Sequence, residues 1–196
     1  MRPRDRRPKR ADVRIALGEL NQFSERLSIP DSVVAEAANI CIDSLGKGLE
    51  SRKPLTRITA TSLYAACREK EVPTTLDDVA VASGVDRDEV AKCYRLMVRE
   101  LDLKIPVPRP ARFMSRVAFR AKVSPRVEAA ALEILSRAGK AGITAGAYPL
   151  GLAASALYVA SILEGEKLTE GEAADAAGVA ESTVRKEYRR LWRILE

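Results

Sequence analysis

The sequence predicts an all-α protein built from two tandem five-helix repeats, the second of which ends in a helix-turn-helix. Residues 60–101 reappear without a gap as residues 154–195, apolar residues recur at helical spacing, and no segment shows the alternation of a strand. When the chain is aligned with itself at a constant offset of 94 positions, many residues are identical in the two copies. They include Ala60, Leu63, Tyr64, Thr75, Gly84, Val90, Tyr94 and Arg95. One module is used twice, so we expect the differences between the copies to carry function.

The first repeat, residues 11–104, is expected to contain helices at 11–27, 30–47, 56–70, 76–83 and 87–101. Thr75 with Asp78, and Asp86 with Glu89, have the spacing at which an N-cap side chain and the third helical residue bond each other's backbone amides. Pro73 ends the third helix because proline has no amide hydrogen to donate. The last helix carries an apolar stripe that we expect to face the core: Val90, Tyr94, Met97, Val98 and Leu101.

Residues 105–110 form a proline-rich linker, IPVPRP, which we expect to be extended and stiff. The second repeat, residues 111–196, repeats the plan with helices at 111–121, 125–138, 149–164, 170–177 and 181–195. Ser124 before Pro125, and Thr169 three residues before Glu172, are helix-start signals. The glycines between the second and third helices lack the preceding strand and following Lys-Ser or Lys-Thr of a phosphate-binding loop. We interpret them as turn residues.

Composition excludes several classes of protein. The 196 residues suffice for two small cores, and no apolar run approaches the roughly 18 residues of a membrane span. The charged start has no apolar stretch after it, so it is no secretory signal. Cys41, Cys67 and Cys93 occur singly in apolar patterns, which is typical of buried thiols in a reducing cytoplasm. We expect no metal, no cofactor and no membrane partner.

The net charge of +6 is unevenly distributed. Residues 1–10 form a basic arm, with six basic side chains against Asp5, which either solubilises the terminus or lies along phosphate. Residues 103–127 hold no acid. Because ordinary helix surfaces mix both signs, this basic island is a candidate phosphate track. Its arginines at the start of the second repeat are Arg109, Arg112, Arg116 and Arg120.

The last two expected helices, joined by Gly178-Val179-Ala180, have the pattern of a helix-turn-helix. Its second helix places Val184, Tyr188, Leu191, Trp192 and Leu195 toward the core. The other face holds the residues that we expect to read bases, which are Ser182, Thr183, Arg185 and Lys186. Phosphate contacts are expected from Arg189, Arg190 and Arg193.

The two copies of this helix differ in charge. Residues 88–99 carry three basic and two acidic side chains, for +1, whereas residues 182–193 carry five basic and one acidic, for +4. Ala180 replaces the capping Asp86, which leaves the first amides of the later helix less occupied and able to meet a phosphate or a base edge. We therefore expect DNA contact from the second copy and protein contact from the acid-rich first copy.

The chain resembles the core of archaeal transcription initiation factor B, the counterpart of general transcription factor IIB, over roughly residues 13–196. The resemblance rests on IALGELN at 15–21, LYAACR at 63–68, CYR at 93–95 with RELDLKIPVP at 99–108, GLAASALY at 151–158 and AGVAESTVR at 177–185. It implies two cyclin-like repeats that clamp promoter DNA bent by TATA-binding protein. It also implies that the helix-turn-helix reads the B-recognition element upstream of the TATA box, which sets preinitiation complex assembly and orientation.

The resemblance places base reading on Ser182, Thr183 and Arg185, and contact with TATA-binding protein or flanking DNA on Arg52 and Lys53. Two departures from the family pattern stand out. The chain has no CxxC pair for a zinc ribbon, so it is either a truncated core or a variant that cannot recruit RNA polymerase in the usual way, and contact with the polymerase is weakened in this prediction. Ser182 stands where eukaryotic relatives often carry an apolar residue, which leaves the preferred base open.

Three other functions compete with this one. A bacterial-style operator binder would need a dimer that matches a two-fold site, whereas duplication within one chain predicts an asymmetric DNA target. A cyclin-like partner of a kinase would share the fold but would need no basic recognition helix, and it would be indifferent to DNA. An enzyme is disfavoured because the chain has no histidine, no nucleotide loop in context and no nucleophile with a base. We expect a protein that is monomeric when free, and cytoplasmic in association with the nucleoid.

Overall fold

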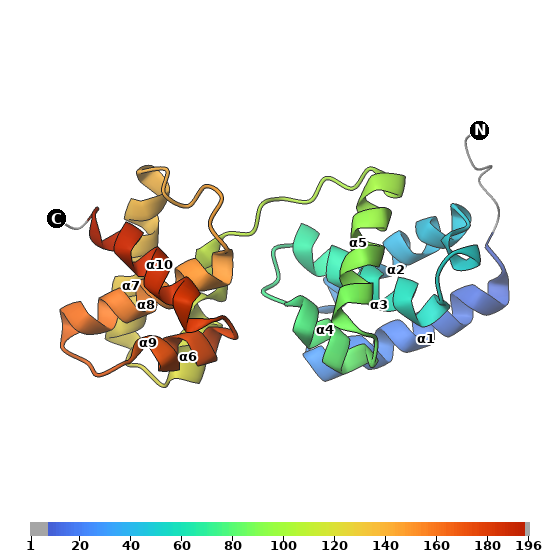
Figure 1. Ribbon diagram of the computed structural model, residues 1–196. Helices are drawn as coiled ribbons and strands as arrows, with labels where there is room; N and C mark the ends of the chain where they lie inside the picture. The colour runs from blue at the N-terminus through green and yellow to red at the C-terminus, as the bar shows by residue number, and fades with distance from the viewer. Residues whose placement is uncertain (1–7, 195–196) are drawn as a thin grey trace. The chain divides into compact units, whose positions relative to one another are not determined.

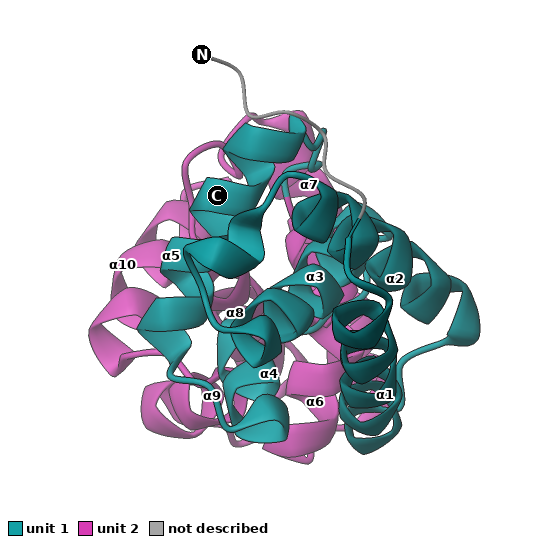
Figure 2. Cartoon of the chain, turned by 90° about the vertical axis from the view of Figure 1, so that its right-hand side faces the viewer, with its two compact units in different colours: residues 1–107 teal, residues 108–196 magenta. Residues whose placement is uncertain are grey.

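The computed structural model describes residues 8–194, and the chain divides between Val107 and Pro108 into two compact units (Figure 2). Most of the basic arm, at residues 1–7, and the last two residues, Leu195 and Glu196, therefore lie outside the described residues. The first unit is a bundle of five α-helices and one short 3-10 helix, η1 (Figure 1). These elements are α1 (Arg10–Leu27), α2 (Asp31–Gly46), η1 (Leu49–Ser51), α3 (Leu55–Glu69), α4 (Leu76–Ser83) and α5 (Arg87–Leu101).

The second unit repeats the five helices in the same order. Its elements are η2 (Pro110–Phe113), α6 (Met114–Ala121), α7 (Pro125–Lys140), α8 (Pro149–Glu164), α9 (Glu170–Ala177) and α10 (Glu181–Trp192). The all-α prediction is confirmed. The expected start of the first helix of this unit was too early, because residues 110–113 form a 3-10 turn in which the Arg112 amide donates to the Arg109 carbonyl at 3.0 Å.

The third helix of each repeat is the centre of its bundle. In α3 every residue from Ile58 to Cys67 is buried, and in α8 every residue from Leu150 to Ser161 is buried except the partly covered Tyr158. A helix that is buried on every side requires other helices around it. The buried residues of α3 and α8 include many alanines, whose small side chains let the neighbouring helices approach closely.

The capping prediction is confirmed at three positions. Thr75 and Thr169 each accept from the amide three residues on, at 3.1 Å, while Asp78 and Glu172 accept from the cap amides at 2.8 Å. Ser124 caps α7 as expected. These side chains satisfy amides that have no partner inside the helix.

The expected reciprocal bond at the start of α5 is not made. Asp86 Oδ1 does accept from the amides of Asp88 at 3.0 Å and Glu89 at 3.1 Å. The Glu89 carboxylate turns instead to the cations Arg57, at 2.5 Å, and Lys92, at 3.1 Å. A charged partner within reach binds a carboxylate more strongly than a single backbone amide does.

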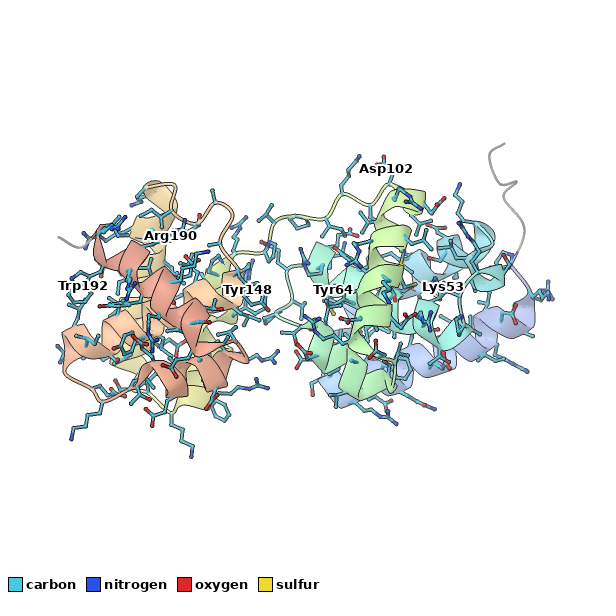
Figure 3. All side chains as sticks on the ribbon, in the orientation of Figure 1. Lys53, Tyr64, Asp102, Tyr148, Arg190 and Trp192 are labelled. Carbon is cyan, nitrogen blue, oxygen red and sulfur yellow. The ribbon has the colours of Figure 1, made fainter. Side chains whose placement is uncertain are left out.

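A pair of tyrosines joins the third and fifth helices in both repeats. Tyr64 and Tyr94 meet edge to face with ring centroids 5.0 Å apart, and their counterparts Tyr158 and Tyr188 do so at 5.5 Å. Because the same contact is made twice, it belongs to the fold and not to the function of either copy. Figure 3 labels Tyr64 of the first pair.

The three cysteines are buried, as expected from the sequence. Burial raises the pKa of the Cys41 and Cys67 thiols to about 11 and also raises the pKa of Cys93. All three thiols are therefore protonated at neutral pH. Among the described residues, no helix combines the length and the apolar character needed to cross a bilayer.

Candidate nucleic-acid interface

The helix-turn-helix consists of α9, a turn at 178–180 and α10. Gly178 adopts the left-handed conformation, with φ of 66°, and the Val179 amide donates to the Ala174 carbonyl at 3.0 Å. A residue with a Cβ is strained in that conformation, which explains the glycine at the turn. Val184 and Leu191 bury one side of α10, and this fixes which side faces solvent.

α10 is seated on α8 by a close helix crossing. A Cβ at Gly151 would lie 2.6 Å from Cγ2 of Thr183, so any larger residue at this point of α8 would force the threonine side chain to move. The Ser155 hydroxyl lies 2.8 Å from the Gly151 carbonyl and 3.0 Å from the Val184 carbonyl, which ties the two backbones together. The first turn of α10 is thus held firmly on the central helix of its repeat.

The predicted base-reading residues divide into two groups. Ser182 and Lys186 are exposed at the front of α10, whereas Thr183 is half-buried with its methyl group against α8. Arg189 and Arg193 continue the exposed face one and two turns further along. The structure therefore brings the front polar residues and two of the expected phosphate contacts onto one solvent-facing side of α10.

Arg185 lies on the same exposed side but is engaged by two carboxylates. Its Nε donates to Glu170 of α9 at 2.8 Å and its Nη2 donates to Glu181 of α10 at 2.5 Å. The hydrogen bond to Glu170, with the charges of both carboxylates, raises the pKa of Arg185 above its ordinary value. The position of Arg185 on the surface follows from the sequence, whereas its contacts with Glu170 and Glu181 do not.

Arg190 has a different position from the one expected of a phosphate contact. Its Nη1 donates to Glu187 at 2.7 Å and its Nη2 donates to the Ile143 carbonyl at 2.8 Å. Glu187 is only 3% exposed, so Arg190, labelled in Figure 3, compensates a buried charge and fastens α10 to the loop before α8. The sequence signal was present, since Glu187 falls between Val184 and Leu191 in the buried stripe.

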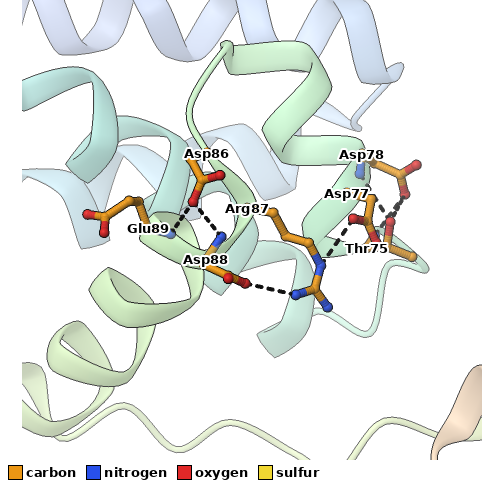
Figure 4. Close-up of polar contacts among 7 residues, drawn as sticks. All are labelled: Thr75, Asp77, Asp78, Asp86, Arg87, Asp88 and Glu89. Carbon is orange, nitrogen blue, oxygen red and sulfur yellow. Dashed lines mark hydrogen bonds and ion pairs between the residues drawn. The ribbon is translucent and has the colours of Figure 1, made fainter.

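The equivalent helix of the first repeat starts in a different electrostatic environment. Asp86 caps α5, and Arg87 joins Asp77 of α4 and Asp88 of α5 at 3.1 Å each (Figure 4). Ala180 of the second repeat makes no side-chain cap, and the first turn of α10 has a single acid, Glu181. The front of α5 is therefore acidic and its amides are occupied, whereas the front of α10 leaves amides open to a partner.

Arg52 and Lys53 follow η1 and precede α3. With six neighbours they line an open cleft of about 520 Å³, the others being Lys9, Asp12, Glu50, Ser51, Pro54 and Leu55. Arg52 makes a long ion pair with Glu100 at 3.7 Å, and Lys53, labelled in Figure 3, is half-buried beside it. The lining carries both signs, so the cleft is a mixed polar surface and not a uniformly basic one.

The basic island starts the second repeat. Arg109 and Arg112 are exposed around η2, Arg120 is exposed on α6, and Arg116 of α6 is half-buried. Arg126 pairs with Glu164 of α8, so this member of the island is neutralised within the repeat. Among the described residues, the exposed cations of the island also include Lys122, just after α6, and Lys104, which pairs with Asp102.

Comparison with known proteins gives the same duplication. The model of the transcription factor TFIIB repeat family matches the chain twice, at residues 10–100 and 103–194. These two stretches correspond to the two five-helix bundles. The match is to a family of transcription factors, and nothing in it favours a kinase partner or an enzyme.

Relatives that match at least nine tenths of this chain are named transcription initiation factor IIB. The chain is 42% identical over 180 residues to transcription initiation factor IIB of Pyrodictium occultum, covering 92% of this chain and 58% of that one. It is 39% identical over 180 residues to the factor of Methanococcus maripaludis strain C7, covering 92% and 53%, and 42% identical over 176 residues to that of Saccharolobus shibatae, covering 90% and 58%. The chain therefore spans little more than half the length of these relatives.

Proposed function

We propose that this chain, which belongs to the transcription factor TFIIB repeat family, acts as a general transcription initiation factor. It binds promoter DNA together with TATA-binding protein and reads the B-recognition element upstream of the TATA box through α10. Because only one repeat reads DNA, the bound complex has a direction, and this sets the orientation of the preinitiation complex. The predicted resemblance to this family is confirmed by both comparisons.

One observation carries the proposal, namely the difference between the last helices of the two repeats. α10 has +4 over residues 182–193 and no side-chain cap, whereas α5 has +1 over residues 88–99 and a carboxylate cap. Arginine pairs with guanine acceptors and hydroxyl groups serve either base in the major groove. A helix with these groups at its exposed front, on a helix-turn-helix, suits base readout.

The residues of α10 then take separate roles. Ser182, Arg185 and Lys186 contact base edges, and Thr183 offers its hydroxyl while its methyl group stays against α8. Arg189 and Arg193 contact phosphate, where they add affinity without sequence preference. Arg190 is left out of this set because Glu187 and Ile143 hold it.

Two further surfaces complete the proposed contacts. Arg52 and Lys53 of the first repeat approach TATA-binding protein or the flanking DNA, and the acidic front of α5 faces protein. The arginines of the basic island follow phosphate next to the element that α10 reads, and these are Arg109, Arg112, Arg116 and Arg120. We expect a monomer in the free state, a location with the nucleoid in the cytoplasm, and a weakened contact with RNA polymerase.

Competition binding with Arg185→Ala tests this assignment. A duplex with a TATA box and its natural upstream flank is compared with one whose upstream flank is scrambled, in the presence of TATA-binding protein. The variant is expected to lose about 1–3 kcal/mol on the preferred duplex and little on the scrambled one. Arg116→Ala should weaken both duplexes alike and flatten the salt dependence. Equal losses on both duplexes for Arg185→Ala would remove α10 from base readout.

A further inference from the structure

The guanidinium of Arg185 is shared between two carboxylates whose surroundings differ. Glu170, the first residue of α9, holds Nε at 2.8 Å and its side chain is 19% exposed. Glu181, the first residue of α10, holds Nη2 at 2.5 Å and is 52% exposed. One partner is therefore mostly covered by the protein, and the other is open to solvent and to any ligand that approaches α10.

Which guanidinium nitrogen each carboxylate holds determines which N–H groups of Arg185 can still bind a base. A guanidinium has five N–H donors in one plane, and a guanine is gripped by two of them on a single edge. Nε is the nitrogen nearest the backbone, so the contact with Glu170 fixes the inner part of the group. The terminal nitrogens remain the outer end, and only the exposed Glu181 competes for them.

We propose that Glu170 is a positioning residue that presents Arg185 to a base pair, and that Glu181 is a competing partner which DNA displaces. This inference rests on the proposed function. Glu170 orders a long side chain before DNA arrives, so the DNA complex does not have to order it. Because Glu170 lies on α9, the position of the Arg185 guanidinium also depends on the angle between α9 and α10.

The two carboxylates are expected to differ in their effect on sequence preference. Removing Glu170 frees Arg185 to find phosphates as well as bases, so sequence preference falls while affinity for unrelated DNA stays equal or rises. Removing Glu181 takes away a competitor and a negative charge that faces the duplex, so affinity for all sequences rises. A general effect of negative charge on α9 or α10 would instead raise the affinity of both variants and leave the sequence preference of both unchanged.

The test uses the full chain with TATA-binding protein and a pool of duplexes whose base pairs upstream of a TATA box are randomised. Sequencing of the bound fraction gives the base preference at each position. Arg185→Ala should lower the preference at one position about tenfold, and this identifies the pair that it reads. Glu170→Ala should lower the preference at that position at least threefold, and Glu170→Gln should lower it less because its carbonyl can still accept from Nε.

The matched control is Asp175→Asn, which removes one exposed carboxylate from the same helix without touching Arg185. It should leave the preference unchanged. The double variant Glu170→Ala/Arg185→Ala should be no worse than Arg185→Ala alone, since the positioning residue acts only through the arginine. Thermal melts show whether each variant folds, and if the alanine variant at 170 does not, the comparison of Glu170→Gln with the control decides.

Two results separate the inference from its premise. If Arg185→Ala changes the preference but neither variant at 170 differs from Asp175→Asn, the positioning role is wrong and the proposed function stands. If Arg185→Ala leaves every position unchanged, base readout by this arginine is itself wrong. A loss of preference in Glu181→Ala equal to that in Glu170→Ala would also overturn the assignment of opposite roles.

Discussion

Gly151 of α8 and Thr183 of α10 are packed so closely that a Cβ at position 151 would lie 2.6 Å from the threonine methyl carbon. At the equivalent positions of the first repeat, Arg57 of α3 and Glu89 of α5 form an ion pair of 2.5 Å. The same crossing of the third and fifth helices is made by direct packing in one repeat and by two charged side chains in the other. The packed version belongs to the repeat whose fifth helix is expected to read DNA.

The close packing at Gly151 predicts that a glycine-to-alanine change in a helix will here destabilise the protein. Alanine normally stabilises a helix interior by about 1 kcal/mol over glycine, but Gly151→Ala is expected to destabilise the second repeat by about 1–2 kcal/mol through overpacking. Urea unfolding measures the change. Thr183→Ser removes the methyl group and should rescue the alanine variant. A Gly151→Ala protein more stable than the parent would show that the crossing has room to spare.

The ion pairs of Glu89 give a prediction about pH. The hydrogen bond from Lys92, with the charge of Arg57, holds the pKa of Glu89 below its ordinary value of 4.5. A carboxylate whose pKa is lowered by folding adds stability above its unfolded pKa, and this is lost as pH falls through the folded value. Glu89→Gln should therefore be less stable than the parent at pH 7, and the difference should shrink below about pH 4.5. Asp43→Asn, at an exposed position of α2, serves as control, and a gap between parent and Glu89→Gln that is constant with pH would contradict the account.

Neighbouring arginines of α10 should separate stability from DNA binding. Arg190→Ala leaves the buried Glu187 without its cation and is expected to cost about 2–3 kcal/mol of folding stability. Arg189→Ala, at an exposed position one residue earlier, should leave stability unchanged and weaken DNA binding. Thermal unfolding and anisotropy with a labelled duplex measure the two effects. An Arg190→Ala protein as stable as Arg189→Ala would assign both side chains to the surface.

Thiol labelling tests the environment of the cysteines. Cys41, Cys67 and Cys93 are buried and their pKa values are raised, so little thiolate is present at pH 7. A maleimide should therefore react with all three only as fast as the first repeat unfolds. Mass spectrometry after timed quenching, with a denatured sample as the positive control, follows the reaction. Rapid labelling of any one of them in the native protein would show that its part of the core opens.

The helix order and the capping threonines could be predicted from the sequence because local spacing determines them. Thr75 with Asp78 and Thr169 with Glu172 are three residues apart, so each contact can be predicted from the sequence spacing alone. The duplication added the long-range information that a single repeat would have lacked. It showed that Tyr64 and Tyr158 occupy the same place in two copies of one bundle.

The contacts that spacing cannot show were missed. Glu170 and Arg185 are 15 residues apart, and Arg190 and Ile143 are 47 apart, so only the packing of separate helices brings them together. The same holds for Gly151, which looks like an ordinary helical glycine until Thr183 is placed beside it. These three contacts decide which polar residues of α10 remain available to a ligand.

Matched double variants at equivalent positions test the functional difference between the repeats most directly. Arg189 and Arg193 of α10 correspond, at the offset of 94, to Arg95 and Arg99 of α5, and all four are exposed. The DNA affinity of each double alanine variant is measured against salt concentration on a TATA duplex with TATA-binding protein present. The account predicts that the α10 variant binds more weakly and reduces the salt slope by about 2, since each lost phosphate contact removes about 0.9, while the α5 variant behaves like the parent. Equal losses in the two variants, or a loss confined to α5, would contradict it.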